Sequence, residues 1–230
     1  MIIITGSGRS GTSAVARLLH ESGISVGRDL IEADRGNTEG YFEERAVVAM
    51  NERLLAGAGL HEWFATVSRE RMLEIAEGHR EEMRALAATA TPAWKDPRFC
   101  WTLEAWLRHF DEKPRILVCL RSPEEVIAST TEYFGLASDE AKRAAAHVWR
   151  AEYERLIEII DAHGLDATCV EYDALLGDTE RTIGGLSSWL GRPIDASGLR
   201  RHLRHHARAV PDEYLPLYER VRGLGYGHVA

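Results

Sequence analysis

The sequence predicts an α/β fold in which a central parallel sheet is flanked by helices. Residues 2–5 form a short apolar run, and a glycine-rich turn and a segment with helical apolar spacing follow it directly. Two more short apolar runs, at residues 115–120 and 168–172, come after segments with the length and spacing of helices. Strands that alternate with helices in this way are typical of a parallel sheet covered by helices.

The first half of the chain supplies two of the expected strands. After the strand at residues 2–5, apolar spacing predicts a helix over residues 12–21, which Gly23 ends. Residues 27–40 are polar and contain several glycines, which indicates a loop. We then expect helices at residues 43–55 and 70–88, a short strand at residues 92–95 and a helix at residues 101–110.

The second half begins with the strand at residues 115–120, whose apolar character throughout indicates a central position in the sheet. Ser122 and Pro123, followed by two glutamates, predict a helix start with a cap, a proline at the first position and acids at the positive end. We further expect a helix at residues 140–162, a strand at residues 168–172 and a helix at residues 179–190. The sequence shows no repeat or linker, so we expect one domain over residues 1–230.

Composition narrows the classes of function. The formal net charge of −8 would repel nucleic acid, so an anionic ligand must be held by a local basic site. Cys100, Cys119 and Cys169 are odd in number and far apart, which argues against a disulfide framework or a metal knuckle and favours reduced thiols in the cytoplasm. We expect no signal peptide and no membrane partner, because the apolar run at the N-terminus is far too short.

The turn at residues 6–13, Gly-Ser-Gly-Arg-Ser-Gly-Thr-Ser, has the spacing of a phosphate-binding P-loop. Such a loop directs backbone N–H groups and a helix N-terminus at one anion. A nucleotide hydrolase carries lysine after the second glycine, where this chain has Thr12, and the cation of this loop is Arg9. The strand at residues 115–120 ends in Arg121 instead of the aspartate that helps to hold magnesium. Cations in these places suit a phosphosulfate.

In these residues the chain resembles the P-loop sulfotransferases, in particular bacterial carbohydrate-type members and tyrosylprotein sulfotransferases. Residues 6–13 resemble their 5′-phosphosulfate loop, and Trp-Lys-Asp-Pro at residues 94–97 resembles a segment whose lysine, here Lys95, assists the transferring sulfuryl group. Arg121 and Ser129 match the family's 3′-phosphate site, including the interval of eight positions between them. Residues 170–176 and 189–191 are similar to a late structural segment.

The resemblance implies a metal-independent transferase that uses 3′-phosphoadenosine-5′-phosphosulfate (PAPS) as co-substrate and releases 3′-phosphoadenosine-5′-phosphate (PAP). The acceptor would be a hydroxyl of a small molecule, such as a natural product or a carbohydrate. The chain departs from the cytosolic sulfotransferases at Arg9, where they use lysine, and it lacks their late Arg-Lys-Gly contact. Their adenine-stacking aromatics have no identified counterpart here. The resemblance assigns donor binding to Gly8, Arg9, Ser10, Gly11, Thr12, Ser13, Arg121 and Ser129, and catalysis to Arg9 and Lys95.

The general base is expected among the acids that follow the first helix. An acceptor hydroxyl loses its proton as it attacks sulfur, so a carboxylate or a histidine should lie within hydrogen-bond reach. Glu43 is the chosen candidate because glycine and aromatic residues around it indicate a shaped turn. Glu32, Glu39 and an unidentified histidine remain alternatives. The arginines and histidines of residues 199–208 are interpreted as a solvated basic helix face.

Two other functions stay open at this level. A small-molecule or nucleoside kinase would share the loop but would need magnesium, against which Thr12 and Arg121 argue. A nucleotide-binding regulator without catalysis would keep the fold, although the presence of Arg9 and Lys95 favours an enzyme. Turnover on a panel of acceptors separates the regulator from an enzyme.

Overall fold

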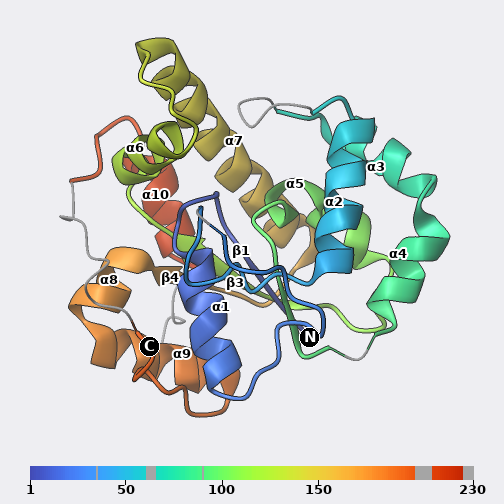
Figure 1. Ribbon diagram of the computed structural model, residues 1–230, viewed down its shortest axis with the longest axis horizontal. Helices are drawn as coiled ribbons and strands as arrows, with labels where there is room; N and C mark the ends of the chain where they lie inside the picture. Colours follow the sequence, from blue (N-terminus) through green and yellow to red (C-terminus); the bar gives the residue numbers. More distant parts are fainter. Residues whose placement is uncertain (35, 61–65, 90, 200–208, 225–230) are drawn as a thin grey trace.

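The computed structural model describes residues 1–34, 36–60, 66–89, 91–199 and 209–224. Four parallel strands form one sheet in the order β2-β1-β3-β4, and helices cover both of its faces (Figure 1). This arrangement confirms the predicted fold class. The strands are β1 (Ile2–Thr5), β2 (Ala93–Lys95), β3 (Arg115–Leu120) and β4 (Ala167–Glu171).

The helices connect these strands and begin and end close to the predicted positions. The structure confirms the helix predicted over residues 12–21 and the one over residues 179–190 at their predicted bounds. The helices of the described residues are α1 (Thr12–Glu21), α2 (Arg45–Gly57), α3 (Arg69–Glu77), α4 (Arg80–Ala87), α5 (Phe99–Leu107), α6 (Pro123–Tyr133), α7 (Asp139–His163), α8 (Tyr172–Gly177), α9 (Thr179–Leu190) and α10 (Leu215–Arg222).

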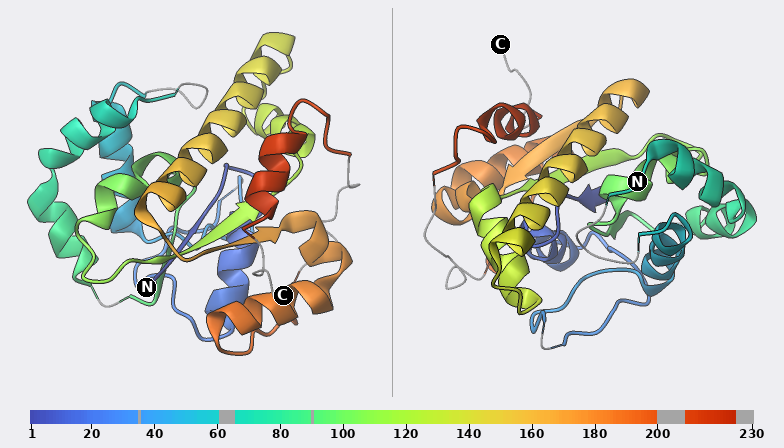
Figure 2. Two further views of the ribbon diagram at one scale, coloured as in Figure 1. Left: turned by 180° about the vertical axis from the view of Figure 1, so that it is seen from behind. Right: turned by 90° about the horizontal axis from the view of Figure 1, so that it is seen from above.

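Alternating side chains of the strands build a core on each face of the sheet. Ile3 belongs to the core that α5 and α7 complete, while its neighbour Ile4 belongs to the core on the opposite face, with α1 and α9. The strand β3 lies between β1 and β4 and is buried along most of its length, as predicted for a central strand. Figure 2 shows α7 and α10 across one face of the sheet, with α1 on the other side.

Three local predictions differ from the structure. Residues 70–88 were expected to form one helix, but they form α3 and α4, separated by Gly78 and His79. The sequence interpretation missed α8, because this helix starts at Tyr172 directly after the last residue of β4, with no turn residue between them. Pro123 does open α6, but Ser122 makes no capping hydrogen bond through its side chain.

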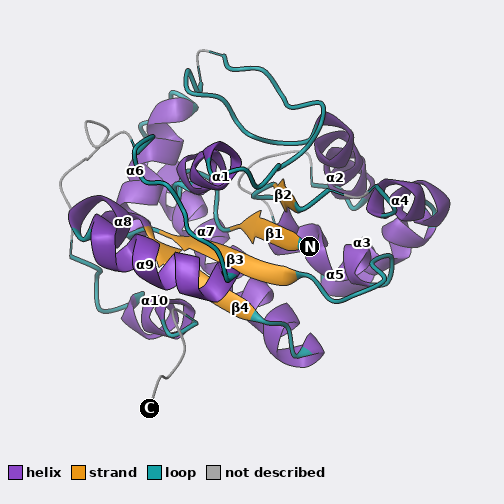
Figure 3. Ribbon diagram, turned by 90° about the horizontal axis from the view of Figure 1, so that it is seen from below, coloured by secondary structure: helices purple, strands orange, loops and turns teal. Residues whose placement is uncertain are grey.

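The carboxyl ends of the four parallel strands lie at one edge of the sheet. The chain leaves β1 toward β2 on one side and later returns to β3 on the other side, so the glycine-rich loop after β1 lies where the direction of winding reverses (Figure 3). Ligands of open α/β sheets bind at such a position. Among the described residues, no helix is both long enough and apolar enough to cross a membrane.

Candidate active site

A cavity of about 560 Å³ opens at the carboxyl edge of the sheet. Its wall combines the glycine-rich loop, the segment between α1 and α2, the end of β2 and parts of α6 and α7. Ser10 is the one predicted site residue outside the wall: it is fully buried, and its hydroxyl lies 3.1 Å from the phenol of Tyr153. The predicted site residues that line the cavity are Gly8, Arg9, Gly11, Thr12, Ser13, Glu43, Lys95, Arg121 and Ser129.

The loop after β1 needs its glycines because the surrounding chain comes very close. Gly6 has φ 141°, and a Cβ atom there would lie 2.2 Å from the carbonyl oxygen of Cys119 on β3. Gly11 has φ 86°, and a Cβ atom there would lie 2.3 Å from the ring of Tyr172. Arg9 itself adopts φ 68°, which is unfavourable for a residue with a side chain. The loop is therefore held in one shape by its packing.

Gly6→Ala is expected to lower the free energy of unfolding by about 2–4 kcal/mol, because the methyl group would overlap backbone and the φ value would be strained. Urea denaturation followed by circular dichroism measures this loss. Gly184→Ala is the matched control: it lies in α9 with no atom within 4 Å of the added Cβ, so alanine should stabilise it by about 0.5–1 kcal/mol. Equal effects of the two changes would contradict this account of the loop.

Lys95 and Glu43 form a buried ion pair at the base of the cavity. Lys95 is the last residue of β2, and its Nζ lies 2.5 Å from Oε1 of Glu43 and 3.2 Å from the hydroxyl of Ser13. The amide of Asn37 donates a second hydrogen bond to the Ser13 hydroxyl at 3.1 Å. The lysine and glutamate side chains are only 2% and 7% exposed, so little water competes with the pair. The structure thus brings a cation and a carboxylate to the first turn of α1.

Burial raises the pKa of the Glu43 carboxyl above its ordinary value. The positive charge of Lys95 acts against this rise, and the negative charge of Asp96 adds to it. A carboxyl with a raised pKa is a better proton acceptor once it is ionised than an exposed one. Glu43 therefore has the environment of a general base, with a cation at one of its oxygens.

A second layer of hydrogen bonds fixes the segment after β2. Asp96 is fully buried and accepts hydrogen bonds from the side-chain amide of Asn51 at 2.8 Å and from the backbone N–H of Arg98 at 2.9 Å. The side-chain oxygen Oδ1 of Asn51 accepts hydrogen bonds from the hydroxyl of Thr102 and from the indole N–H of Trp106. Asp96 thereby holds the side chain of Asn51 and the backbone at Arg98 in place.

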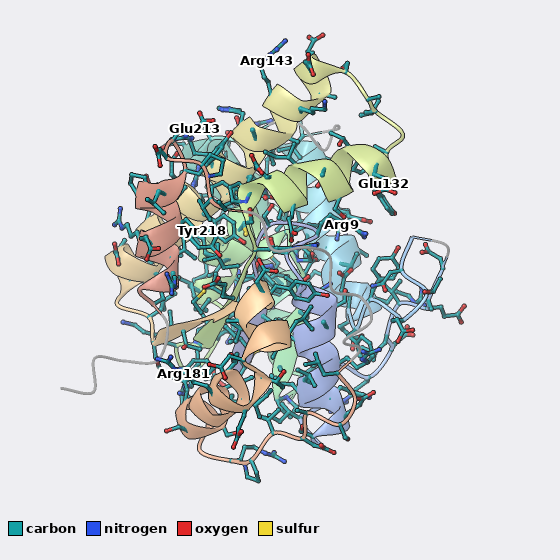
Figure 4. All side chains as sticks on the ribbon, turned by 90° about the vertical axis from the view of Figure 1, so that its left-hand side faces the viewer. Arg9, Glu132, Arg143, Arg181, Glu213 and Tyr218 are labelled. Atoms are coloured by element: carbon teal, nitrogen blue, oxygen red, sulfur yellow. The ribbon has the colours of Figure 1, made fainter. Side chains whose placement is uncertain are left out.

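The predicted 3′-phosphate residues lie beside the glycine-rich loop. Nε of Arg9 donates to the hydroxyl of Ser129 on α6 at 3.0 Å, and Arg9 lies between α6 and the segment that follows α1 (Figure 4). Arg121 donates to the backbone carbonyl of Arg9 at 3.3 Å and to Oε2 of Glu125 at 2.7 Å. Its guanidinium also lies 5.0 Å from the ring centre of Tyr172. Arg9, Arg121 and Ser129 therefore form one group of donors.

The residues that remained as alternatives to Glu43 for the general base lie in different environments. Glu32 is exposed and does not line the cavity, whereas Glu39 lines it and pairs with Arg17 of α1. No histidine of the described residues lines the cavity. The basic segment at residues 200–208 lies outside the described residues, so its predicted role stays a prediction.

Sequence reasoning missed several residues of the site. Arg98 lines the cavity and follows the Lys-Asp-Pro segment directly, so its position in the sequence was an available signal. Asn37 and Asn51 gave no comparable signal, because a lone asparagine in a loop or helix is common. Tyr133, the last residue of α6, and Phe134, which follows it, also line the cavity.

Comparisons with known proteins show the family and the fold of this chain. A family model described as "Sulfotransferase family" matches residues 2–196. The fold is similar to that of a sulfotransferase domain from the Synechococcus PCC 7002 olefin synthase, with a TM-score of 0.54, 16% identity and coverage of 96% of this chain and 93% of that chain. A sulfotransferase domain from the curacin biosynthetic pathway gives a TM-score of 0.53, 15% identity and 96% coverage of both chains. No curated protein sequence matches the chain. At these identities the structural likeness concerns the fold alone.

Proposed function

Because this chain belongs to the sulfotransferase family, we propose that it transfers a sulfuryl group from PAPS to a hydroxyl group of a small-molecule acceptor. The proposal rests on one observation: Arg9, Lys95 and Arg121 line the same cavity as the carboxylate of Glu43. Three cations suit a donor with several anionic groups, and a carboxylate suits an acceptor that must lose a proton.

In the proposed reaction the backbone N–H groups of residues 8–13 and the side chain of Arg9 hold the 5′-phosphosulfate. Arg121 and Ser129 hold the 3′-phosphate and so align the donor. The acceptor oxygen forms a bond to sulfur while the bond between sulfur and the bridging oxygen breaks, and PAP leaves. Lys95 stabilises the charge that grows on the bridging oxygen, and Glu43 accepts the acceptor proton.

The acceptor class is part of the proposal. The cavity wall offers aromatic side chains, Tyr41, Phe42 and Tyr133, together with the polar groups near Glu43. A small natural product or a carbohydrate hydroxyl suits such a mixed wall. A cytoplasmic location is also proposed, on the ground that Cys100, Cys119 and Cys169 are buried and unpaired.

PAP is expected to stabilise the protein far more than ADP, which lacks the 3′-phosphate. A ligand that binds only the native state contributes about 2.7 kcal/mol at a hundredfold excess over its Kd. For a chain of this size that corresponds to a rise in Tm of about 5–10 °C, measured by differential scanning fluorimetry. Equal shifts with PAP and ADP would remove the PAPS donor from the proposal.

Arg121→Ala is expected to abolish most of this preference, because a charge-assisted hydrogen bond to phosphate contributes about 1.5–3 kcal/mol. Each variant is compared with its own ligand-free Tm, since the change also leaves Glu125 without its partner. Arg108→Ala, at an exposed ion pair with Glu77, is the matched control and should keep the preference. A preference for PAP that survives in Arg121→Ala would place the 3′-phosphate elsewhere.

Transfer is expected to continue in the presence of a chelator. A kinase loop places lysine where Thr12 lies and a magnesium-binding aspartate where Arg121 lies, so this chain lacks both groups at those positions. The measurement is PAPS-dependent mass gain on a panel of hydroxyl acceptors, with and without chelator. Loss of transfer that added magnesium restores would favour the kinase alternative, and PAP binding without any turnover would favour the regulator.

A further inference from the structure

Glu152 is a buried carboxyl in the cavity wall that the proposed mechanism does not use. It projects from α7, is 9% exposed and lines the cavity together with Ser7 of the glycine-rich loop. Its Oε2 atom has no hydrogen-bond partner among the described residues. A buried polar atom without a partner is unfavourable for stability, so packing alone gives no reason for a glutamate here.

The apolar stripe of α7 makes this position unusual. Glu152 lies one turn from Trp149 and one turn from Leu156, both of which are buried in the core, so an apolar residue would fit the helix pattern better. Instead, the polar side chains of Ser7 and Trp101 lie near enough to the carboxyl to lower its pKa. It therefore connects α7 to the start of the loop that we propose to bind the donor.

Burial raises the pKa of Glu152 to about 7, and hydrogen bonds from Ser7 and Trp101 limit the rise. The helices α5, α6 and α10 pack against α7. From α5 the thiol of Cys100 faces the carboxyl, and its pKa is raised well above the ordinary value by burial first and by the charge of Glu152 second. Three charged side chains near α7 are engaged in ion pairs of their own: Glu104 with Arg69, Arg121 with Glu125, and Arg220 with Asp161.

We propose that Glu152 is a positioning residue behind the glycine-rich loop, and that it takes up a proton from solvent when an anionic donor binds. As a carboxylate it would repel the phosphosulfate that enters the loop. As a neutral acid it no longer repels the anion and still holds Ser7 in place. The inference rests on the proposed function for the identity of the anion, and it goes beyond it by coupling donor binding to a proton.

The expected proton uptake follows from the pKa of Glu152 and from its change when the anion binds. At pH 7.5 a group with a pKa of about 7 is about one quarter protonated in the free protein. If the bound anion raises this pKa by about one unit, as a like charge nearby does, about half a proton enters per PAP bound. The Kd for PAP should then weaken about fivefold between pH 7 and pH 9, a range in which the phosphates of PAP, with a second pKa of about 6, are almost fully ionised.

Isothermal titration calorimetry of PAP at pH 7.5, in two buffers with different enthalpies of ionisation, measures the proton uptake directly. The wild type is expected to take up about half a proton. Glu152→Gln, which mimics the neutral acid, is expected to bind PAP with no uptake from this site and with a Kd that stays level from pH 7 to pH 9. Glu154→Gln, on the exposed side of the same helix, is the matched control and should behave as the wild type.

Each outcome of this experiment decides the matter. Wild-type binding without proton uptake overturns the inference and leaves the proposed function in place, whether or not Glu152→Gln folds. Uptake of the same size in wild type and in folded Glu152→Gln assigns the proton to another group and also overturns it. Failure of the wild type to bind PAP at any pH removes the PAPS donor, and the inference falls with it.

Discussion

Lys95→Ala is expected to lower kcat by about 10²–10³-fold while it changes the Kd for PAP much less. Removal of one preorganised donor to a developing oxyanion has an effect of this size, because the interaction strengthens as charge grows in the transition state. PAP carries neither the sulfuryl group nor the bond that breaks, so its affinity reports on the phosphate contacts alone. Steady-state kinetics at saturating PAPS, with PAP titrations on the same protein, separate the two effects.

The ion pair makes folding the first control for this variant. Loss of Lys95 removes the nearer partner of the buried Glu43 and leaves it Arg98 at 3.9 Å, and breaking a buried pair destabilises a protein by about 3–5 kcal/mol. The double variant Lys95→Met with Glu43→Gln removes both charges, so it should recover much of that stability and remain inactive. Lys142→Ala, at an exposed pair with Asp139, should leave both activity and stability unchanged.

Two results would contradict the role of Lys95. If Lys95→Ala weakened PAP binding as strongly as it lowered kcat, the lysine would contact the phosphates in the ground state. If the double variant recovered activity together with stability, the ion pair would serve only to hold the fold. A loss of kcat that persists in a stable double variant supports a role of the ion pair in the chemical step, and the part due to Lys95 is the loss beyond that of Glu43→Gln alone.

The donor side of the cavity could be predicted from the sequence because its residues follow strands directly. In a parallel sheet the carboxyl ends of strands share one edge, so Arg121 after β3 and Lys95 at the end of β2 had to lie near the loop after β1. The apolar strands and the glycine stops of α1 and α9 were equally local signals. The side-chain roles remain predictions, although the structure brings these groups together.

Other features depended on contacts that a single sequence does not reveal. Glu152 lies at a core-facing position of α7, far along the chain from the loop that it approaches. The pairing of Glu43 with Lys95 spans the sheet edge and the segment before α2, so the sequence favoured Glu43 but kept Glu32 and Glu39 as alternatives. Residues 70–88 kept one helical period across Gly78, and only the structure shows that α3 ends at Glu77 and that α4 begins at Arg80.

Glu43→Gln is expected to lower kcat by about 10²-fold or more, the contribution that a positioned general base makes to proton transfer. In the wild type, kcat should fall as the pH is lowered through the pKa of Glu43, because the protonated carboxyl accepts no proton. Burial raises this pKa, so the fall should occur above the ordinary range of an exposed glutamate. Glutamine should remove that dependence and leave a low, level rate.

The measurement is kcat against pH at saturating PAPS, so that a proton coupled to donor binding does not enter the profile. Glu32→Gln is the control at an exposed carboxyl outside the cavity wall and should keep the wild-type rate, while Glu39→Gln tests the rival that pairs with Arg17. Glutamine still accepts a hydrogen bond from Lys95, so the lysine stays near its place, and a loss of rate reports on the proton. Full activity in Glu43→Gln would transfer the role of base to another group. Loss of activity with an unchanged pH profile would show that Glu43 serves mainly to hold Lys95.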